Sequence, residues 1–84
     1  MPWEASAPRR VSVRMPNGDV EEVDESAPFA ETIQQILRRR AIATALVYVR
    51  RVGEVDVRPV EPGDAPATFQ GLEEVEIRQY LKAG

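Results

Sequence analysis

The stretch from Val11 to Val23 reads VSVRMPNGDVEEV, and it decides how the N-terminal half folds. Apolar and polar residues alternate from Val11 to Met15, which is the period of a strand with one buried face. The turn-forming residues Pro16-Asn17-Gly18-Asp19 follow, and a second strand-like run covers Val20 to Val23. Because Asn-Gly readily supplies the two positive φ angles of a type I′ turn, the stretch predicts a tight β-hairpin.

The segment after the hairpin carries the signals of one amphipathic helix. Ser26 is a suitable N-cap residue, and Pro28 suits the first helical turn. Between Phe29 and Arg40, apolar residues recur at helical spacing, which predicts one buried stripe. The three arginines at 38–40 fall at the C-terminal end, where positive charge offsets the helix dipole. We therefore interpret them as a helix end and not as a nucleic-acid site.

Three further segments complete the pattern. The run Ala45 to Val49 (ALVYV) is rich in strand-forming residues and predicts a well-buried strand. Residues 50–57 predict a turn into a short strand, and the prolines and glycine of residues 59–66 predict a loop. Apolar and charged residues alternate again from Glu74 to Arg78, which predicts the last strand.

Together these elements predict an α+β fold, with a four- to five-stranded mixed sheet packed on one helix. The chain has 84 residues, which corresponds to one domain. We expect a flexible leader over residues 1–10, a domain over residues 11–80 and an extended tail over residues 81–84. The residues expected to share one core are Phe29, Ile33, Ile36, Leu37, Leu46, Val75 and Ile77, with Phe69 and Leu72 anchoring the loop.

The composition excludes several classes of function. The chain has no Cys and no His, so it lacks thiolate chemistry, disulfides and the main residues of nucleophile–base pairs and transition-metal sites. Its net charge is -3 with acids and bases interleaved, which disfavours nucleic-acid binding. No apolar run approaches the roughly 20 residues of a membrane span. We expect a cytoplasmic protein that is not an enzyme, binds no cofactor or metal, and contacts neither nucleic acid nor membrane.

The order and spacing of four stretches resemble those of the ubiquitin-like β-grasp family. These stretches are the hairpin VSVRMPNGDVEEV, the helix FAETIQQILRRRAI, the strand ALVYV and the ending EEVEIRQYLKAG. The resemblance covers about Val11 to Gly84 and lies in element order and apolar pattern, which makes it specific for fold. It implies a ubiquitin-like β-grasp in which the sheet wraps one helix.

The resemblance also implies a function for the C-terminal residues, because 81–84 (LKAG) align with the Leu-Arg-Gly-Gly tail of ubiquitin. In that family an activating enzyme adenylates the terminal glycine carboxylate, which passes through a thioester to a target amine or hydroxyl. Four extended residues reach roughly 14 Å, and small residues pass a narrow channel. The implied conjugation residue is Gly84, and the implied partner-binding residues are Tyr80, Leu81, Lys82, Ala83 and Arg78.

The implied partners are activating and conjugating enzymes, a processing peptidase and target proteins. Arg78 and Tyr80 differ from the residues of ubiquitin at those positions, so the resemblance implies a dedicated, bacterial-type partner system. Lys82 is the only lysine, whereas ten residues are arginine. A modifier with so few amines is poorly suited to forming chains of itself, and this favours the modifier function.

Two alternatives stay open. The first is a non-conjugated β-grasp adaptor, or a small subunit of a larger secretion or oxygenase complex. Its contact face would include the outward positions Arg14, Arg50 and Arg78 of the expected strands. The second is a sulfur carrier, which would use the same terminal carboxylate as a thiocarboxylate.

Overall fold

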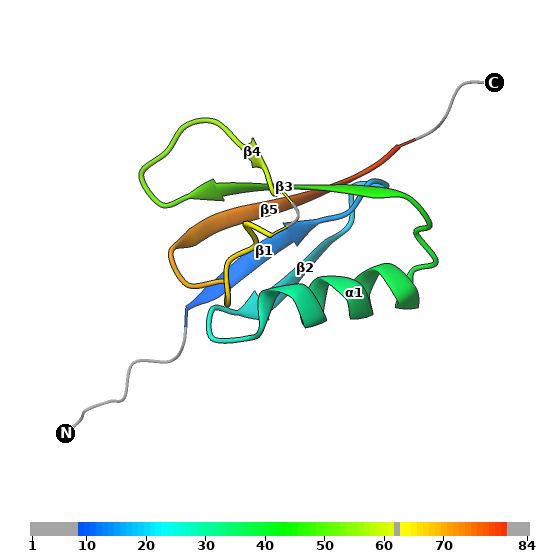
Figure 1. Ribbon diagram of the computed structural model, residues 1–84, viewed down its shortest axis with the longest axis horizontal. Helices are drawn as coiled ribbons and strands as arrows, with labels where there is room; N and C mark the ends of the chain where they lie inside the picture. Colours follow the sequence, from blue (N-terminus) through cyan, green and yellow to red (C-terminus); the bar gives the residue numbers. More distant parts are fainter. Residues whose placement is uncertain (1–8, 62, 81–84) are drawn as a thin grey trace.

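The computed structural model describes residues 9–61 and 63–80. Within these ranges the chain forms one five-stranded mixed sheet and one helix, which lies along a single face of the sheet (Figure 1). The predicted α+β class and mixed sheet are therefore confirmed. The flexibility predicted for residues 1–8 and the extended tail predicted for residues 81–84 lie outside the described residues and stay predictions.

The first and last strands lie side by side at the centre of the sheet. The strand order is β2-β1-β5-β3-β4; β1 and β5 are parallel, and the other neighbours are antiparallel. A hairpin, a crossover helix and a central parallel pair give a layout that is consistent with a β-grasp. The elements are β1 (Arg10–Arg14), β2 (Val20–Asp24), α1 (Phe29–Arg39), β3 (Ala45–Arg51), β4 (Arg58–Pro59) and β5 (Leu72–Gln79).

The start of the sheet includes two residues that the sequence assigned to the leader. Arg10 is the first residue of β1, one position earlier than expected. Arg9 donates a hydrogen bond from Nη1 to the carbonyl oxygen of Leu72 at 2.8 Å, and its Nη2 lies 2.9 Å from Glu73 Oε1. The guanidinium of Arg9 thus ties the beginning of β1 to the beginning of β5.

The helix and the inner face of the sheet enclose one apolar core. Eight of the predicted core residues are confirmed: Leu37 is half-buried, and Phe29, Ile33, Ile36, Phe69, Leu72, Val75 and Ile77 are buried. Phe29 and Phe69 are in contact, with ring centroids 4.9 Å apart. The core also contains Val11, Val13, Met15 and Val49.

One core prediction is wrong, because Leu46 is 45% exposed. The ladder pairs Leu46 with Arg78 and Val47 with Ile77. Since neighbouring strand residues point to opposite faces, Val47 faces the core and Leu46 faces outward. The run ALVYV is apolar on both faces, so its own pattern does not fix which face is buried.

The hairpin forms where the sequence places it, but its turn type is not the expected one. Gly18 has a φ of 95°, whereas Asn17 is not among the described residues with positive φ. The amide of Gly18 donates to the Met15 carbonyl at 3.0 Å, and the Met15 amide donates to Asp19 at 2.7 Å. This is a type I turn followed by a left-handed glycine. Pro16 explains the correction, because its ring fixes φ near -65° at the first turn position.

The start of α1 also differs from the expectation, because Ser26 does not cap the helix. The N-cap position is Pro28, and no side chain makes a cap hydrogen bond. Instead, the amide of Phe29 donates to the Ala67 carbonyl at 3.0 Å, and Pro28 forms an isolated β-bridge with Thr68. A distant loop thus satisfies an amide that a local side chain was expected to satisfy.

The end of α1 is a Schellman motif with an alanine at its left-handed position. The amide of Ile42 donates to Leu37 at 2.9 Å and that of Ala41 donates to Arg38 at 3.2 Å. Ala41 has a φ of 56°. Glycine usually occupies this position because it lacks a Cβ atom. The predicted arginines lie at this end, with Arg38 and Arg39 in the last turn.

The short strand expected within residues 50–57 is not formed. β3 extends to Arg51, and residues 52–57 reverse the chain before β4, which begins at Arg58. The amide of Glu54 donates to the Arg51 carbonyl at 2.9 Å, which closes a turn. Val55 is 89% exposed at this reversal, so the apolar spacing of the segment reflects no buried face.

Candidate functional site

The outer face of the sheet, opposite α1, is the candidate functional site. Ladder pairing aligns one residue from each strand in a continuous row across it, namely Val20, Arg14, Glu76, Tyr48 and Pro59. Within the described ranges, the only helix lies on the other face of the sheet (Figure 1). Because the strands fix these positions, the outer face presents its side chains on a rigid base.

A carboxylate at the middle of the outer face holds two arginines from different strands. Glu74 of β5 lies 3.2 Å from Arg14 Nη2 and 3.3 Å from Arg50 Nη2, through its two oxygens. The predicted outward orientation of Arg14 and Arg50 is therefore confirmed. These arginines are not a row of unpaired positive charge, because both share one carboxylate. Glu74 and Arg50 are half-buried and Arg14 is exposed, so these pairs stay in contact with solvent and each contributes little to stability.

Arg78 is held more firmly than an ordinary surface arginine. Its guanidinium carbon lies 4.2 Å from the centroid of the Tyr48 ring on the neighbouring strand. Its Nε lies 3.0 Å from Glu76 Oε2. The hydrogen bond with Glu76 raises the pKa of Arg78 above its usual value. A planar cation stacked on an aromatic ring and fixed from one edge loses little conformational freedom when a partner binds it.

The stacked pair belongs to a group that we name the tyrosine–arginine patch, defined as Leu46, Tyr48, Arg78 and Tyr80. The Tyr80 amide donates to the Thr44 carbonyl at 3.1 Å, which continues the β3–β5 ladder beyond its last strand residue. By strand alternation, Tyr80 then lies on the same face as Arg78. Tyr80 is 57% exposed and Leu46 is 45% exposed. Exposed aromatic, arginine and aliphatic side chains on a rigid sheet are typical of a protein contact surface.

The sequence identified half of this patch. Arg78 and Tyr80 were expected to bind partners, and the structure places both at the same end of the outer face. Leu46 was assigned to the core, and Tyr48 was not singled out. Strand alternation could have identified both residues. Leu46 and Tyr48 share the face of Arg50, which points outward. The other implied site residues, Leu81, Lys82, Ala83 and Gly84, lie outside the described residues.

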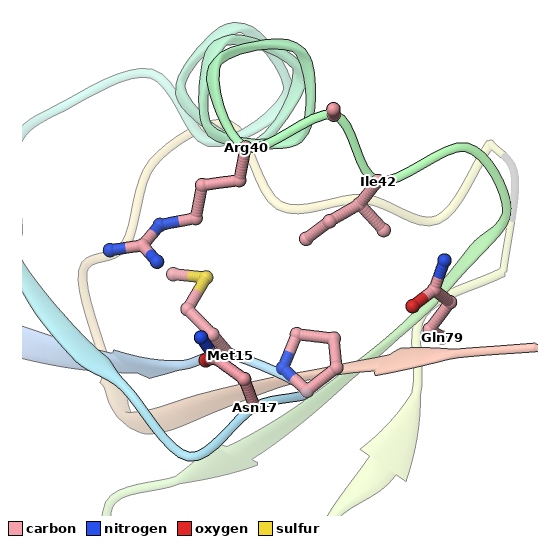
Figure 2. Close-up of a pocket in the computed structure, with 7 residues that line it drawn as sticks. Met15, Asn17, Arg40, Ile42 and Gln79 are labelled. Atoms are coloured by element: carbon pink, nitrogen blue, oxygen red, sulfur yellow. The ribbon is translucent and has the colours of Figure 1, made fainter.

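A depression of about 450 Å³ lies at one end of the molecule, where the β1–β2 turn approaches the end of α1 (Figure 2). Arg40 and Ile42 project from the helix end, Met15 and Asn17 come from the hairpin, and Gln79 closes one side. The polar groups in this depression are a guanidinium and two side-chain amides. None of them is a nucleophile or a base that acts near neutral pH.

The charge of Arg40 is already compensated by the hairpin. Its Nε lies 2.7 Å from Glu21 Oε2, and its Nη1 lies 3.1 Å from Asp19 Oδ2. Hydrogen bonds from Arg40 and Asn17 lower the pKa of Asp19. Burial opposes ionisation of Glu21, but hydrogen bonds from Arg40 and Arg39 outweigh it and lower the pKa of that carboxyl. We assign this cluster to stability, because it fastens the end of α1 to β2.

Other kinds of site find little support in the part of the chain that the structure describes. There, no group of three or more His, Cys, Asp or Glu side chains is arranged to hold a metal ion. None of the described helices has the length and apolar composition needed to cross a membrane. The outer face therefore carries the functional argument.

Comparisons with protein-family models, with curated proteins and with solved structures give no match for this chain.

Proposed function

We propose that this chain is a ubiquitin-like β-grasp module that binds other proteins through the outer face of its sheet. The support for the family is the layout of hairpin, crossover helix and central parallel strands, together with the sequence resemblance. The observation that carries the function is the tyrosine–arginine patch. It combines exposure with a fixed arrangement, and no described part of the chain packs against it.

The partner surface should match the chemistry of this patch. Leu46 and Tyr80 offer apolar area to an aliphatic or aromatic side chain of the partner. Arg78 already bonds to Glu76 through Nε and Nη2, and its remaining N–H groups favour a neutral carbonyl acceptor of the partner. The neighbouring arginines are already shared with carboxylates, so the face does not present the concentrated positive charge that phosphate backbones and anionic lipids require. We therefore propose a protein partner, and we keep the cytoplasm as its proposed location.

The test compares capture of partners by matched variants in the native host. Tagged wild-type protein, the double variant Leu46→Gln/Arg78→Ala and the control Gln35→Glu are expressed at equal levels. Gln35 is exposed on α1, on the other side of the molecule. We expect a protein that is retained by wild type and control and lost from the double variant. It must then bind the purified wild-type chain directly. If every retained protein binds the double variant equally well, the outer face is not the contact surface.

Conjugation is the second candidate function, and it involves the same end of the sheet. Tyr80 directly precedes the LKAG segment in the chain and Arg78 lies two residues before Tyr80, so an enzyme that binds the patch would reach Gly84. The near absence of lysine also favours this function. The module and modifier proposals share one binding surface and differ in whether the Gly84 carboxylate reacts.

Mass spectrometry distinguishes the two proposals. The full chain and a chain lacking Gly84 are each mixed with a candidate activating enzyme and ATP. A modifier forms an adduct through the Gly84 carboxylate, and the truncated chain forms none. A sulfur carrier gives a thiocarboxylate at the same position when a sulfur donor is supplied. Equal labelling of both chains, or no labelling, leaves the adaptor function as the proposal.

A further inference from the structure

The β1–β2 turn contains an Asn-Gly pair, which is a chemically labile sequence. The pair is Asn17-Gly18, and Asn17 is the only asparagine of the chain. An asparagine followed by glycine readily loses its side-chain amide, because glycine has no Cβ atom to hinder the ring that forms between the two residues. Both residues are exposed at the turn, so water and hydroxide reach them.

The reaction requires the backbone nitrogen of Gly18 to attack the side chain of Asn17. The nitrogen first loses its proton to hydroxide and then forms a bond with Cγ of Asn17. The bond between Cγ and Nδ2 breaks, and Nδ2 leaves as ammonia after taking a proton from water. Water then opens the resulting succinimide at either of its two carbonyl carbons. The products are aspartate and isoaspartate, and in isoaspartate the backbone runs through the former side chain.

The folded turn engages both reacting groups in hydrogen bonds. The Gly18 N–H donates to the Met15 carbonyl at 3.0 Å, so the electron pair left by deprotonation points across the hairpin and not toward Cγ. The Asn17 carboxamide is bonded to Asp19: Oδ1 accepts from its backbone N–H at 3.0 Å, and Nδ2 donates to its Oδ2 at 3.2 Å. The ring therefore cannot close until these hydrogen bonds break.

The end of α1 holds the same carboxylate. Asp19 Oδ2 also accepts from Arg40 Nη1 at 3.1 Å, so one oxygen joins the helix to the side chain of Asn17. Figure 2 shows Arg40 and Asn17 on either side of the depression at this end of the molecule. A residue far away in the sequence thereby helps to fix the conformation of the labile pair.

We propose that Asn17 is a deamidation site that the folded hairpin protects, so that the residue is modified only when the turn opens. In the open turn, Gly18 and Asn17 react as they would in an unstructured peptide. Isoaspartate cannot restore the turn, because its additional backbone atom displaces the Gly18 N–H from Met15. The product also places a second carboxylate beside Asp19, at the depression that Arg40 lines. The proposal does not depend on the tyrosine–arginine patch.

The first test compares the rate of amide loss in the folded chain and in a peptide of residues 13–22, blocked at both ends. Mass spectrometry of proteolytic fragments follows the reaction at the same mildly alkaline pH. We expect the folded chain to react at least about tenfold more slowly than the peptide, and to reach the peptide rate in urea that unfolds it. Gln70 also precedes a glycine and is the internal control, because its longer side chain closes a ring more slowly. Equal rates in the folded chain and the peptide, or an unreactive Asn17 in the peptide, would overturn the proposal.

The second test removes part of the restraint without touching the reacting pair. Asp19→Ala deletes the acceptor that Asn17 shares with Arg40. The folded variant should deamidate about two- to tenfold faster than wild type, whereas the same change in the peptide should leave its rate nearly unaltered. Hydrogen exchange of the Gly18 amide should accelerate by the same factor, since both reactions need the same opening. The control Asp24→Ala removes an exposed carboxylate at the other end of β2 and should react like wild type. An Asp19→Ala protein that deamidates as slowly as wild type would contradict the proposed protection.

Discussion

Replacing Ala41 by glycine should stabilise the protein, although alanine is normally the better residue in and around helices. Ala41 is the only described non-glycine residue with a positive φ, at 56°. An L-residue in the left-handed region costs about 1–2 kcal/mol, which glycine avoids. Glycine in turn loses about 0.5–1 kcal/mol more conformational entropy on folding. Ala41 is exposed, so little packing is lost. We therefore expect a net gain of about 0.5–1 kcal/mol.

Urea unfolding followed by far-UV circular dichroism measures this gain, and thermal unfolding provides a second reading. In a domain of this size the midpoint temperature should rise by about 2–8 °C. The matched control is Ala43→Gly in the loop that follows, where φ is not positive and glycine should be neutral or destabilising. Ala41→Val should be less stable than wild type, because a β-branched side chain fits the left-handed region poorly. If Ala41→Gly is no more stable than Ala43→Gly, the left-handed conformation of Ala41 does not cost stability.

Three further changes test the fold and its charges. Ile33→Ala should cost about 2–5 kcal/mol in urea unfolding, since Ile33 is buried between helix and sheet, and a loss below about 1 kcal/mol would place it outside the core. Gly18→Ala should destabilise the hairpin by about 1 kcal/mol because φ is 95° there, and an unchanged midpoint would contradict that backbone geometry. Glu21→Gln should make the free energy of unfolding fall less steeply as the pH is lowered into the acid range. The lowered pKa values of Glu21 and Asp19 contribute stability above their ordinary values of 4.5 and 3.8, and this contribution is lost as pH falls through the folded-state values. If the free energy of unfolding of the variant falls as steeply in acid as that of wild type, Glu21 does not make the contacts with Arg40.

The elements with strong local signals could be predicted from the sequence, whereas details set by distant residues could not. The hairpin strands were located correctly because alternation and Asn-Gly act over a few residues. The turn type was missed because Pro16 was not weighed against the Asn-Gly preference. Ser26 failed as a cap because the loop at Ala67 satisfies the Phe29 amide instead. Leu46 was misassigned because pairing with β5 decides which side of an all-apolar run is buried.

In the candidate site, too, local patterns predict some residues, whereas contacts between strands could not be predicted. Arg78 and Tyr80 follow from alternation in the last strand and from the resemblance of the chain ending. The stacking of Arg78 on Tyr48 depends on the pairing of β3 with β5, which no local pattern reveals. The pairing of Arg14 and Arg50 with one carboxylate likewise needs three strands in register. Sequence alone therefore gave an outward row of arginines, and the structure shows that this row is largely neutralised.

The central claim is that the outer face of the sheet contacts other proteins. Amide chemical shifts of the ¹⁵N-labelled chain test it most directly, when a purified partner is added that the wild-type protein retains. The largest shifts should fall at Leu46, Tyr48, Arg78 and Tyr80, and Leu46→Gln/Arg78→Ala should abolish them. Shifts that fall instead on the exposed face of α1, with the outer face unchanged, would contradict it.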